Sequence, residues 1–168
     1  LVRKGPASND VVRFVDRREN ALSVRGNNEE KILSGEVDVD PFELIVDRIE
    51  SMPLVVSWGD SMVVHGGIDP RKAPAAHTAT ELLEMRGLPP GSGYDGPFWF
   101  ERYEGPARVF FGHTVFGSPF VCDSAVGLDT GCVYGGALTA YDCANDETIQ
   151  VTAERTYVSR SESKILQL

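Results

Sequence analysis

The spacing of apolar residues predicts helices mainly in the first half of the chain and strands mainly in the second. Residues 8–19 predict a helix with Ser8 as its N-cap and an apolar face. Another helix begins at Asp40-Pro41, because Asp caps helices and Pro suits the first helical position. Its apolar residues recur on one face as far as Met52-Pro53. Two further short helices are predicted at residues 29–34 and 78–86.

Short runs of β-branched and aromatic residues predict the strands. Two of these runs are joined by Gly59-Asp60, a dipeptide typical of a hairpin turn. The predicted strands are residues 21–25, 54–58, 61–65, 108–111, 125–129, 137–142 and 148–158. Because helices and strands alternate early and strands dominate later, we expect an α/β fold with packed sheets.

Length and charge narrow the class of protein. The 168 residues fit a single domain, residues 1–168, that is large enough to bury a core. A net charge of −9 argues against binding to nucleic acid or to an anionic membrane surface. No apolar run approaches the length of a membrane span. The three cysteines match neither a disulfide framework nor a zinc pattern, so we expect a cytoplasmic protein.

The chain begins with Leu1 rather than Met, and residues 1–6 have the pattern of a strand that runs into a turn. A natural domain seldom begins in this way. We therefore expect that residues upstream of Leu1 belong to the domain.

Two of the three histidines, His65 and His113, stand in matching contexts. Each follows an apolar run that predicts a strand, and each has a glycine beside it. A side chain at the end of a buried strand is held rigidly, and the glycine leaves room for a ligand, as a metal site requires. The alternative is that each histidine merely caps its strand by binding a loop carbonyl. The matching contexts favour a shared site.

Two polar turns add candidate ligands. Asn27 follows a glycine at the end of a predicted strand, so its amide oxygen could bind a divalent cation or simply begin a helix. Arg3 and Lys4 precede a Gly-Pro turn next to a predicted helix. Such cations either bind phosphate or remain solvated surface charges.

These motifs occur in a recognisable order. Basic-Gly-Pro is followed by Gly-Asn-Asn-Glu, then by His-Gly-Gly-Ile-Asp-Pro and Gly-His-Thr. In this order and spacing the chain resembles the calcineurin-like metallophosphoesterases of the phosphoprotein-phosphatase type. It is most similar to the bacterial branch that includes the symmetrical diadenosine-tetraphosphate hydrolases. The resemblance runs from residue 1 to about residue 158 and is close over residues 127–140.

The resemblance implies a layered sandwich of two mixed β-sheets flanked by helices, without the first βα segment of that family. It also implies roles for particular residues. Asn27, His65 and His113 match the ligands of one of two divalent metal ions. Lys4 matches a phosphate-binding arginine, and Arg86 is a second phosphate-binding candidate. The implied metal is manganese, although such a mixed shell also accepts zinc or iron. The implied reaction is hydrolysis by a metal-bound hydroxide.

Three features depart from the family pattern. Its first Asp-x-His motif does not occur in the sequence, and neither does the Gly-Asp that would precede Leu1. Asn28 replaces the catalytic histidine, and Arg3 replaces the aspartate that orients this histidine. The last two changes fit each other, because an orienting aspartate has no such role without its imidazole. A catalytic site with Arg3 and Asn28 favours leaving groups that need little protonation, such as a phosphoanhydride.

The resemblance implies a metal-dependent hydrolase that acts on a phosphoprotein, a dinucleoside polyphosphate or inorganic polyphosphate. The alternative is a binding module that keeps the phosphatase fold, lacks catalysis and recognises a partner or a phosphorylated ligand. The aromatic run 98–100 would either stack on a nucleobase or, as we favour, pack in the core. The pattern gives no expectation for the oligomeric state.

Overall fold

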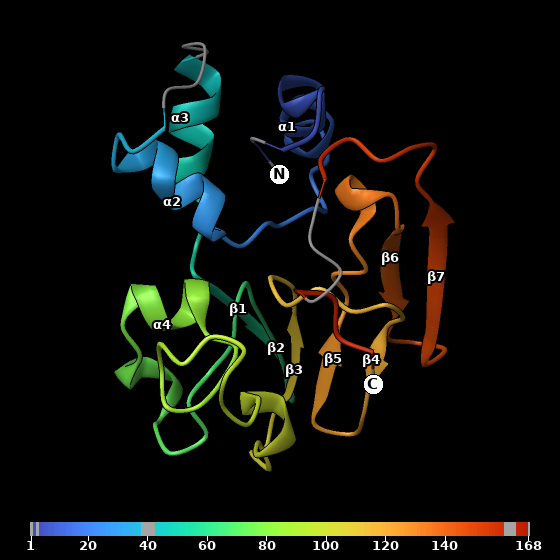
Figure 1. Cartoon of the computed structure of the whole chain (residues 1–168). Helices are drawn as coiled ribbons and strands as arrows, with labels where there is room; N and C mark the ends of the chain where they lie inside the picture. Colours follow the sequence, from blue (N-terminus) through green and yellow to red (C-terminus); the bar gives the residue numbers. More distant parts are fainter. Residues whose placement is uncertain (1, 3, 38–42, 160–163, 168) are drawn as a thin grey trace.

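Two β-sheets and two groups of helices make up the molecule (Figure 1). The computed structural model describes residues 2, 4–37, 43–159 and 164–167. The described helices are α1 (Ser8–Asp16), α2 (Asn27–Leu33), α3 (Glu43–Glu50) and α4 (Ala79–Glu84), with 3-10 turns η1 (Pro74–Ala76), η2 (Trp99–Glu101) and η3 (Cys132–Tyr134). The described strands are β1 (Val55–Trp58), β2 (Ser61–Val64), β3 (Arg108–Phe111), β4 (Phe120–Val121), β5 (Ala125–Gly127), β6 (Ala137–Asp142) and β7 (Glu147–Thr152).

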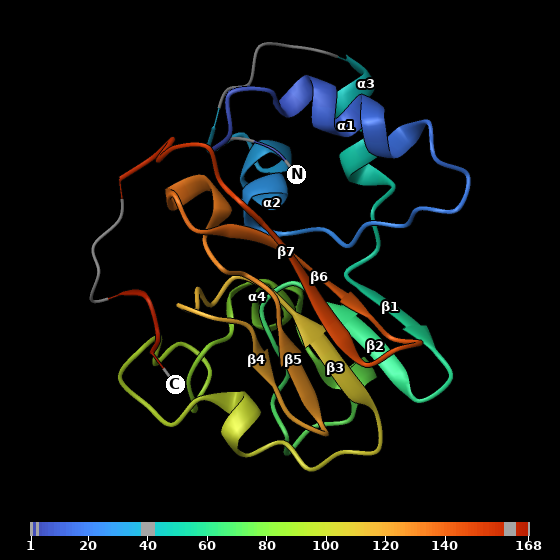
Figure 2. The ribbon, with the colours of Figure 1, turned by 90° about the vertical axis from the view of Figure 1, so that its right-hand side faces the viewer.

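The larger sheet is mixed, with the strand order β1-β2-β3-β5-β4. Its inner strands β2, β3 and β5 run parallel, whereas β1 and β4 pair antiparallel at the two edges. The smaller sheet is the β6–β7 hairpin, which is paired along its whole length. Figures 1 and 2 together show α4 on one side of the larger sheet and the hairpin on the other. The predicted α/β sandwich with two sheets is therefore confirmed.

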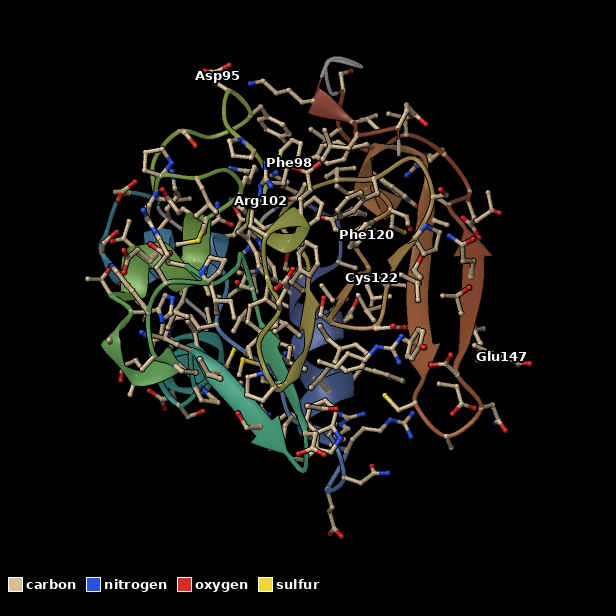
Figure 3. All side chains as sticks on the ribbon, turned by 90° about the horizontal axis from the view of Figure 1, so that it is seen from below. Asp95, Phe98, Arg102, Phe120, Cys122 and Glu147 are labelled. Carbon is tan, nitrogen blue, oxygen red and sulfur yellow. The ribbon has the colours of Figure 1, made fainter. Side chains whose placement is uncertain are left out.

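Alternation along β3 explains how the larger sheet uses both faces. Val109 and Phe111 belong to the main core, which packs under α4 and η2. Phe110 points to the opposite face, where its ring stacks on Trp58 at a centroid distance of 5.8 Å. Trp99 lies at the centre of the main core and is completely buried. Phe98 and Phe120 border this core on the same side of the molecule (Figure 3). The core interpretation of the aromatic run 98–100 is thus confirmed for Trp99 and Phe100.

The helices α1, α2 and α3 gather at one end of the molecule, with α2 nearest the sheet (Figures 1 and 2). A separate small core holds this group together: Val2, Val12, Ile32 and Ile49. Because α2 contributes to this core, its first turn is fixed above the ends of the strands.

Local predictions near the first helix were partly wrong. The helix ends at Asp16 rather than residue 19, and Ser8 is its first residue, because Ala7 occupies the N-cap without a side-chain cap bond. Its apolar face is only partly covered: Val12 is buried, but Phe14 is 60% exposed. The small core has room for one side of α1, so the remaining apolar positions face outward.

Two predicted strands also differ from the structure. Residues 21–25 form no strand: Ala21 N–H binds the nearby Arg18 carbonyl, and the backbone bond from Arg25 N–H to the Pro53 carbonyl, 2.8 Å long, does not continue into a ladder. The last predicted strand ends at Thr152, where the chain turns and Ala153 N–H binds the Gly136 carbonyl at 2.8 Å. The hairpin of β1 and β2 is confirmed, whereas the predicted helix start at residues 40–42 lies outside the described residues.

Within the described part of the chain, no helix combines the length and apolar character needed to cross a membrane. The cytoplasmic location stays a prediction.

Candidate metal centre

His65 and His113 meet because they follow neighbouring parallel strands, β2 and β3. The carboxyl ends of parallel strands lie at the same edge of a sheet. A hydrogen bond from Gly112 N–H to the His65 carbonyl, 3.0 Å long, extends the ladder to the two histidines. Their ring centroids are 5.1 Å apart, and the rings are inclined by 58°. The two histidines in matching contexts thus lie side by side, and their shared role as metal ligands stays a prediction.

Asn27 reaches the histidines from the first turn of α2. Its Oδ1 lies 3.1 Å from Nε2 of His65. The N-cap residue is Gly26, and a Cβ there would lie only 2.9 Å from the His65 ring. The glycine therefore allows the imidazole to pack directly against the backbone of the helix start.

The buried carboxylate of Glu29, a residue that is only 3% exposed, holds the start of α2 in place through hydrogen bonds. One carboxylate oxygen accepts a hydrogen bond from Gly26 N–H at 3.0 Å, and the other accepts one from Val2 N–H at 3.1 Å. Glu29 therefore acts as a positioning residue for Asn27. The signal in the sequence is the spacing Gly-x-x-Glu, the capping-box distance.

The backbone and ring contacts of His113 are those of a metal ligand: one ring nitrogen is held by the protein and the other has no partner among the described residues. Its φ of 63° lies in the left-handed region, which is uncommon for a residue with a side chain. Its Nε2 is buried and has no hydrogen-bond partner among the described residues. Because the Glu84 backbone is hydrogen-bonded to the ring, we infer that Nδ1 makes this bond. A histidine that binds a metal through one nitrogen and a backbone carbonyl through the other has the same arrangement.

Both histidines are neutral at pH 7. Burial lowers the pKa of His65 to about 4, although the charge of Glu29 opposes this shift. Burial, aided by the positive charge of Arg86, lowers the pKa of His113 to about 2. A neutral imidazole is the form that binds a metal ion.

The donor set of Asn27, His65 and His113 fits a divalent cation. It offers two imidazole nitrogens and one amide oxygen, which come from α2 and the ends of β2 and β3. Such mixed shells suit manganese, zinc or iron. The described residues include no group of three or more His, Cys, Asp or Glu side chains placed to hold a metal. Among these residues, therefore, the candidate donors suffice for one ion.

Two predicted phosphate-binding cations lie beside this centre. Arg86 donates from Nη2 to the His113 carbonyl at 3.3 Å, and its guanidinium lies over the Tyr94 ring, 5.1 Å from the centroid. Lys4 is hydrogen-bonded to the Tyr134 hydroxyl, and its Nζ also lies 5.1 Å from the centroid of that ring. Lys4 and Arg86 both line one cavity of about 590 Å³.

Five further residues line the same cavity, and three of them have polar or charged side chains that matter here: Tyr94, Tyr134 and Lys164. No sequence pattern indicates these three residues, because they come from a loop, a 3-10 turn and a C-terminal segment that only the tertiary structure brings together. The C-terminal segment is tied to the loop by a hydrogen bond from the Tyr94 hydroxyl to the Lys164 carbonyl at 3.3 Å.

The two predicted catalytic residues have different outcomes. Asn28 is half-buried and follows Asn27 in the first turn of α2, beside the candidate ligands. Arg3 lies outside the described residues. The roles assigned to both stay predictions. The third histidine, His77, is separate from this site, because its Nε2 accepts a hydrogen bond from Asp69 N–H at 2.7 Å.

A second cavity, of about 640 Å³, lies between the two sheets and reaches His65 and His113 at one end. Its walls include the aromatic rings of Trp58, Phe110 and Tyr141. The candidate metal centre thus has an apolar side, towards the sheets, and a positively charged side, towards Lys4 and Arg86.

The sequence was compared with protein families and with individual known proteins. No family model matches the chain. Over 60 residues it is 43% identical to the asymmetrical bis(5'-nucleosyl)-tetraphosphatase PrpE of Geobacillus sp. strain WCH70, a match that spans 36% of this chain and 24% of that protein. The protein of the same name from Bacillus velezensis is 28% identical over 192 residues, which cover 94% of this chain and 77% of that protein.

The fold has a counterpart among solved structures. The crystal structure of a protein assigned as a diadenosine tetraphosphatase matches with a TM-score of 0.77 and 27% identity, over 90% of this chain and 77% of that chain. The predicted resemblance is therefore confirmed: the chain has the calcineurin-like metallophosphoesterase fold. Within that class, its relatives are named tetraphosphatases, and their names specify asymmetrical rather than symmetrical hydrolysis.

Proposed function

We propose that this protein is a metal-dependent hydrolase that cleaves a phosphoanhydride bond of a dinucleoside tetraphosphate. The observation that carries the proposal is the buried Nε2 of His113, which has no partner among the described residues. It lies beside the His65–Asn27 pair, next to a cavity whose described charged side chains are all positive. Buried polar atoms almost always have partners, so an orphaned imidazole nitrogen indicates a ligand. The names of the relatives support the substrate class.

Each residue has a defined task in this proposal. Asn27, His65 and His113 would hold a divalent ion, which we propose to be manganese. When bound, such an ion lowers the pKa of a water molecule and neutralises negative charge as it develops. Arg86 and Lys4 would bind phosphate oxygens, and Glu29 would keep Asn27 in position. The expected second ion stays a prediction.

The residue at position 28 favours an anhydride as the substrate. An asparagine amide donates hydrogen bonds, but it cannot deliver a proton at neutral pH as a histidine can. A phosphate leaving group in an anhydride is stable as an anion and needs no such proton, whereas the alkoxide of a serine does. We therefore propose a dinucleoside polyphosphate as the substrate in preference to a phosphoprotein.

The experiment compares two substrates in the presence of Mn²⁺. Bis(5'-adenosyl) tetraphosphate should be hydrolysed to ATP and AMP, the products of asymmetrical cleavage, which ion-exchange chromatography separates. A phosphoserine peptide should be cleaved much more slowly. Equal rates on both substrates would contradict the preference for an anhydride. No hydrolysis, together with retained binding of the tetraphosphate, would instead favour the non-catalytic binding module.

Two variants test the residues. His113→Ala should lower the affinity for Mn²⁺ by more than about 100-fold, because even the partners of metal ligands contribute 10–100-fold. His77→Gln is the matched control, since it removes an imidazole that lies outside the site but keeps an acceptor for Asp69 N–H. Unchanged Mn²⁺ affinity in His113→Ala would exclude this histidine as a ligand.

A further inference from the structure

The cavity beside the metal centre combines positive charge with fixed geometry. Among the residues that the structure describes, three charged side chains line it, Lys4, Arg86 and Lys164, and all three are cations. The protein as a whole has a net charge of −9, so this concentration of cations runs against its general composition. The one acidic residue of the adjacent loop, Asp95, lies at the outer tip of the loop and points away from the molecule (Figure 3).

Aromatic rings hold two of these cations in place. The Arg86 guanidinium lies over Tyr94, 5.1 Å from the ring centroid, and the Lys4 ammonium is held by its hydrogen bond to the Tyr134 hydroxyl. Cation–π contacts restrict long side chains that would otherwise sample many rotamers. A ligand that binds these cations therefore pays less of the entropy cost of ordering them.

Lys164 lines the same cavity. Its backbone carbonyl accepts a hydrogen bond from the Tyr94 hydroxyl. Lys164 is therefore bonded to the same tyrosine whose ring contacts the Arg86 guanidinium. Arg86 in turn binds the His113 carbonyl. A continuous chain of contacts therefore leads from the candidate metal centre through Arg86 and Tyr94 to Lys164.

We propose that this cavity is a polyphosphate subsite, in which Lys164 binds the phosphate groups remote from the bond that is cleaved. This inference rests on the proposed function and adds a specificity-determining residue to it. A linear anion with several phosphates can bind several cations of one cavity at once, whereas a single phosphate binds fewer of them. The volume of about 590 Å³ is within the usual range of ligand pockets.

The experiment measures binding separately from hydrolysis. Isothermal titration calorimetry in the presence of EDTA, with inorganic tripolyphosphate as the probe, reports the subsite without turnover. Lys164→Ala should weaken binding roughly fivefold, as expected for one exposed cation, and the loss should shrink in high salt. Lys164→Arg should retain binding. Lys31→Ala is the matched control, because Lys31 pairs with Glu36 and does not line the cavity.

A second titration identifies the source of the phosphates. If bis(5'-adenosyl) tetraphosphate and inorganic tripolyphosphate lose affinity equally in Lys164→Ala, the shared polyphosphate chain is the ligand of this residue. Equal affinity of the wild type and Lys164→Ala for both probes would overturn the proposal, even if the protein hydrolyses the tetraphosphate. The opposite result, a Lys164-dependent affinity without hydrolysis, would support the subsite and contradict the proposed function.

Discussion

Gly26 is the residue on which the geometry of the candidate centre depends most sharply. Its φ of −107° and ψ of 173° suit any residue, so Gly26→Ala introduces no backbone strain. The added methyl group, however, would lie 2.6 Å from the Glu29 carboxylate and 2.9 Å from the His65 ring. Ordinary contact begins at 3.4 Å, so the ring must retreat by about 0.5 Å and the carboxylate by about 0.8 Å.

These displacements have two measurable effects. Movement of the Glu29 carboxylate weakens its bond to Gly26 N–H, a cap interaction worth about 1 kcal/mol. Overpacking adds about 1–3 kcal/mol. A total of about 2–4 kcal/mol lowers the melting temperature of a chain of this length by about 5–15 °C. A binding site keeps its affinity only while its ligands stay within about 0.5 Å of their proper positions. Because His65 would move by about this distance, Mn²⁺ affinity should fall about 10–100-fold.

Differential scanning calorimetry and Mn²⁺ titration check the two effects. Gly5→Ala is the matched control, because a Cβ at Gly5 would meet no heavy atom within 4 Å. A Gly26→Ala protein that melts within 1–2 °C of the wild type and binds Mn²⁺ equally well would refute the reasoning about close packing.

Three further substitutions test other parts of the account. Glu29→Gln leaves one of two backbone N–H donors without an acceptor and should cost about 1–3 kcal/mol in urea unfolding; no loss would contradict its positioning role. Hydrogen bonds from Arg71 lower the pKa of Asp69 from 3.8 to about 2, so this pair stabilises the fold above about pH 4, and the stabilisation disappears as the pH falls through about 2. Arg71→Gln should therefore lower stability at pH 7 but not near pH 2, and an equal effect at both pH values would argue against the pair. Trp99→Phe removes a buried hydrogen bond to the Gly66 carbonyl and ring volume, so it should cost about 2–3 kcal/mol without changing Mn²⁺ content.

The features that the sequence predicted well are those fixed by local patterns. The β1–β2 hairpin and β3 were predictable, because short runs of β-branched and aromatic residues occur there and Gly59-Asp60 marks the turn. The meeting of His65 and His113 was also predictable, since both follow buried strands. Residues 21–25 show the limit of this reasoning: their composition suits a strand, but among the described residues no strand lies beside them to complete a ladder.

The features that could not be predicted depend on contacts between distant segments. The orphaned Nε2 of His113 results from burial and from the left-handed backbone at that residue, neither of which has a signature in the sequence. The positive cavity joins Lys4 and Lys164, which lie near opposite ends of the sequence. Lys164 itself is exposed, and it follows a polar run of the sequence whose composition is typical of ordinary surface.

The central claim is that Asn27, His65 and His113 hold a divalent metal ion. The most direct test is elemental mass spectrometry of the wild type, His113→Ala and the control His77→Gln after incubation with Mn²⁺ and desalting. We predict that the wild type and His77→Gln retain manganese and that His113→Ala retains almost none. Equal manganese in His113→Ala and the wild type, or none in the wild type, would contradict the claim.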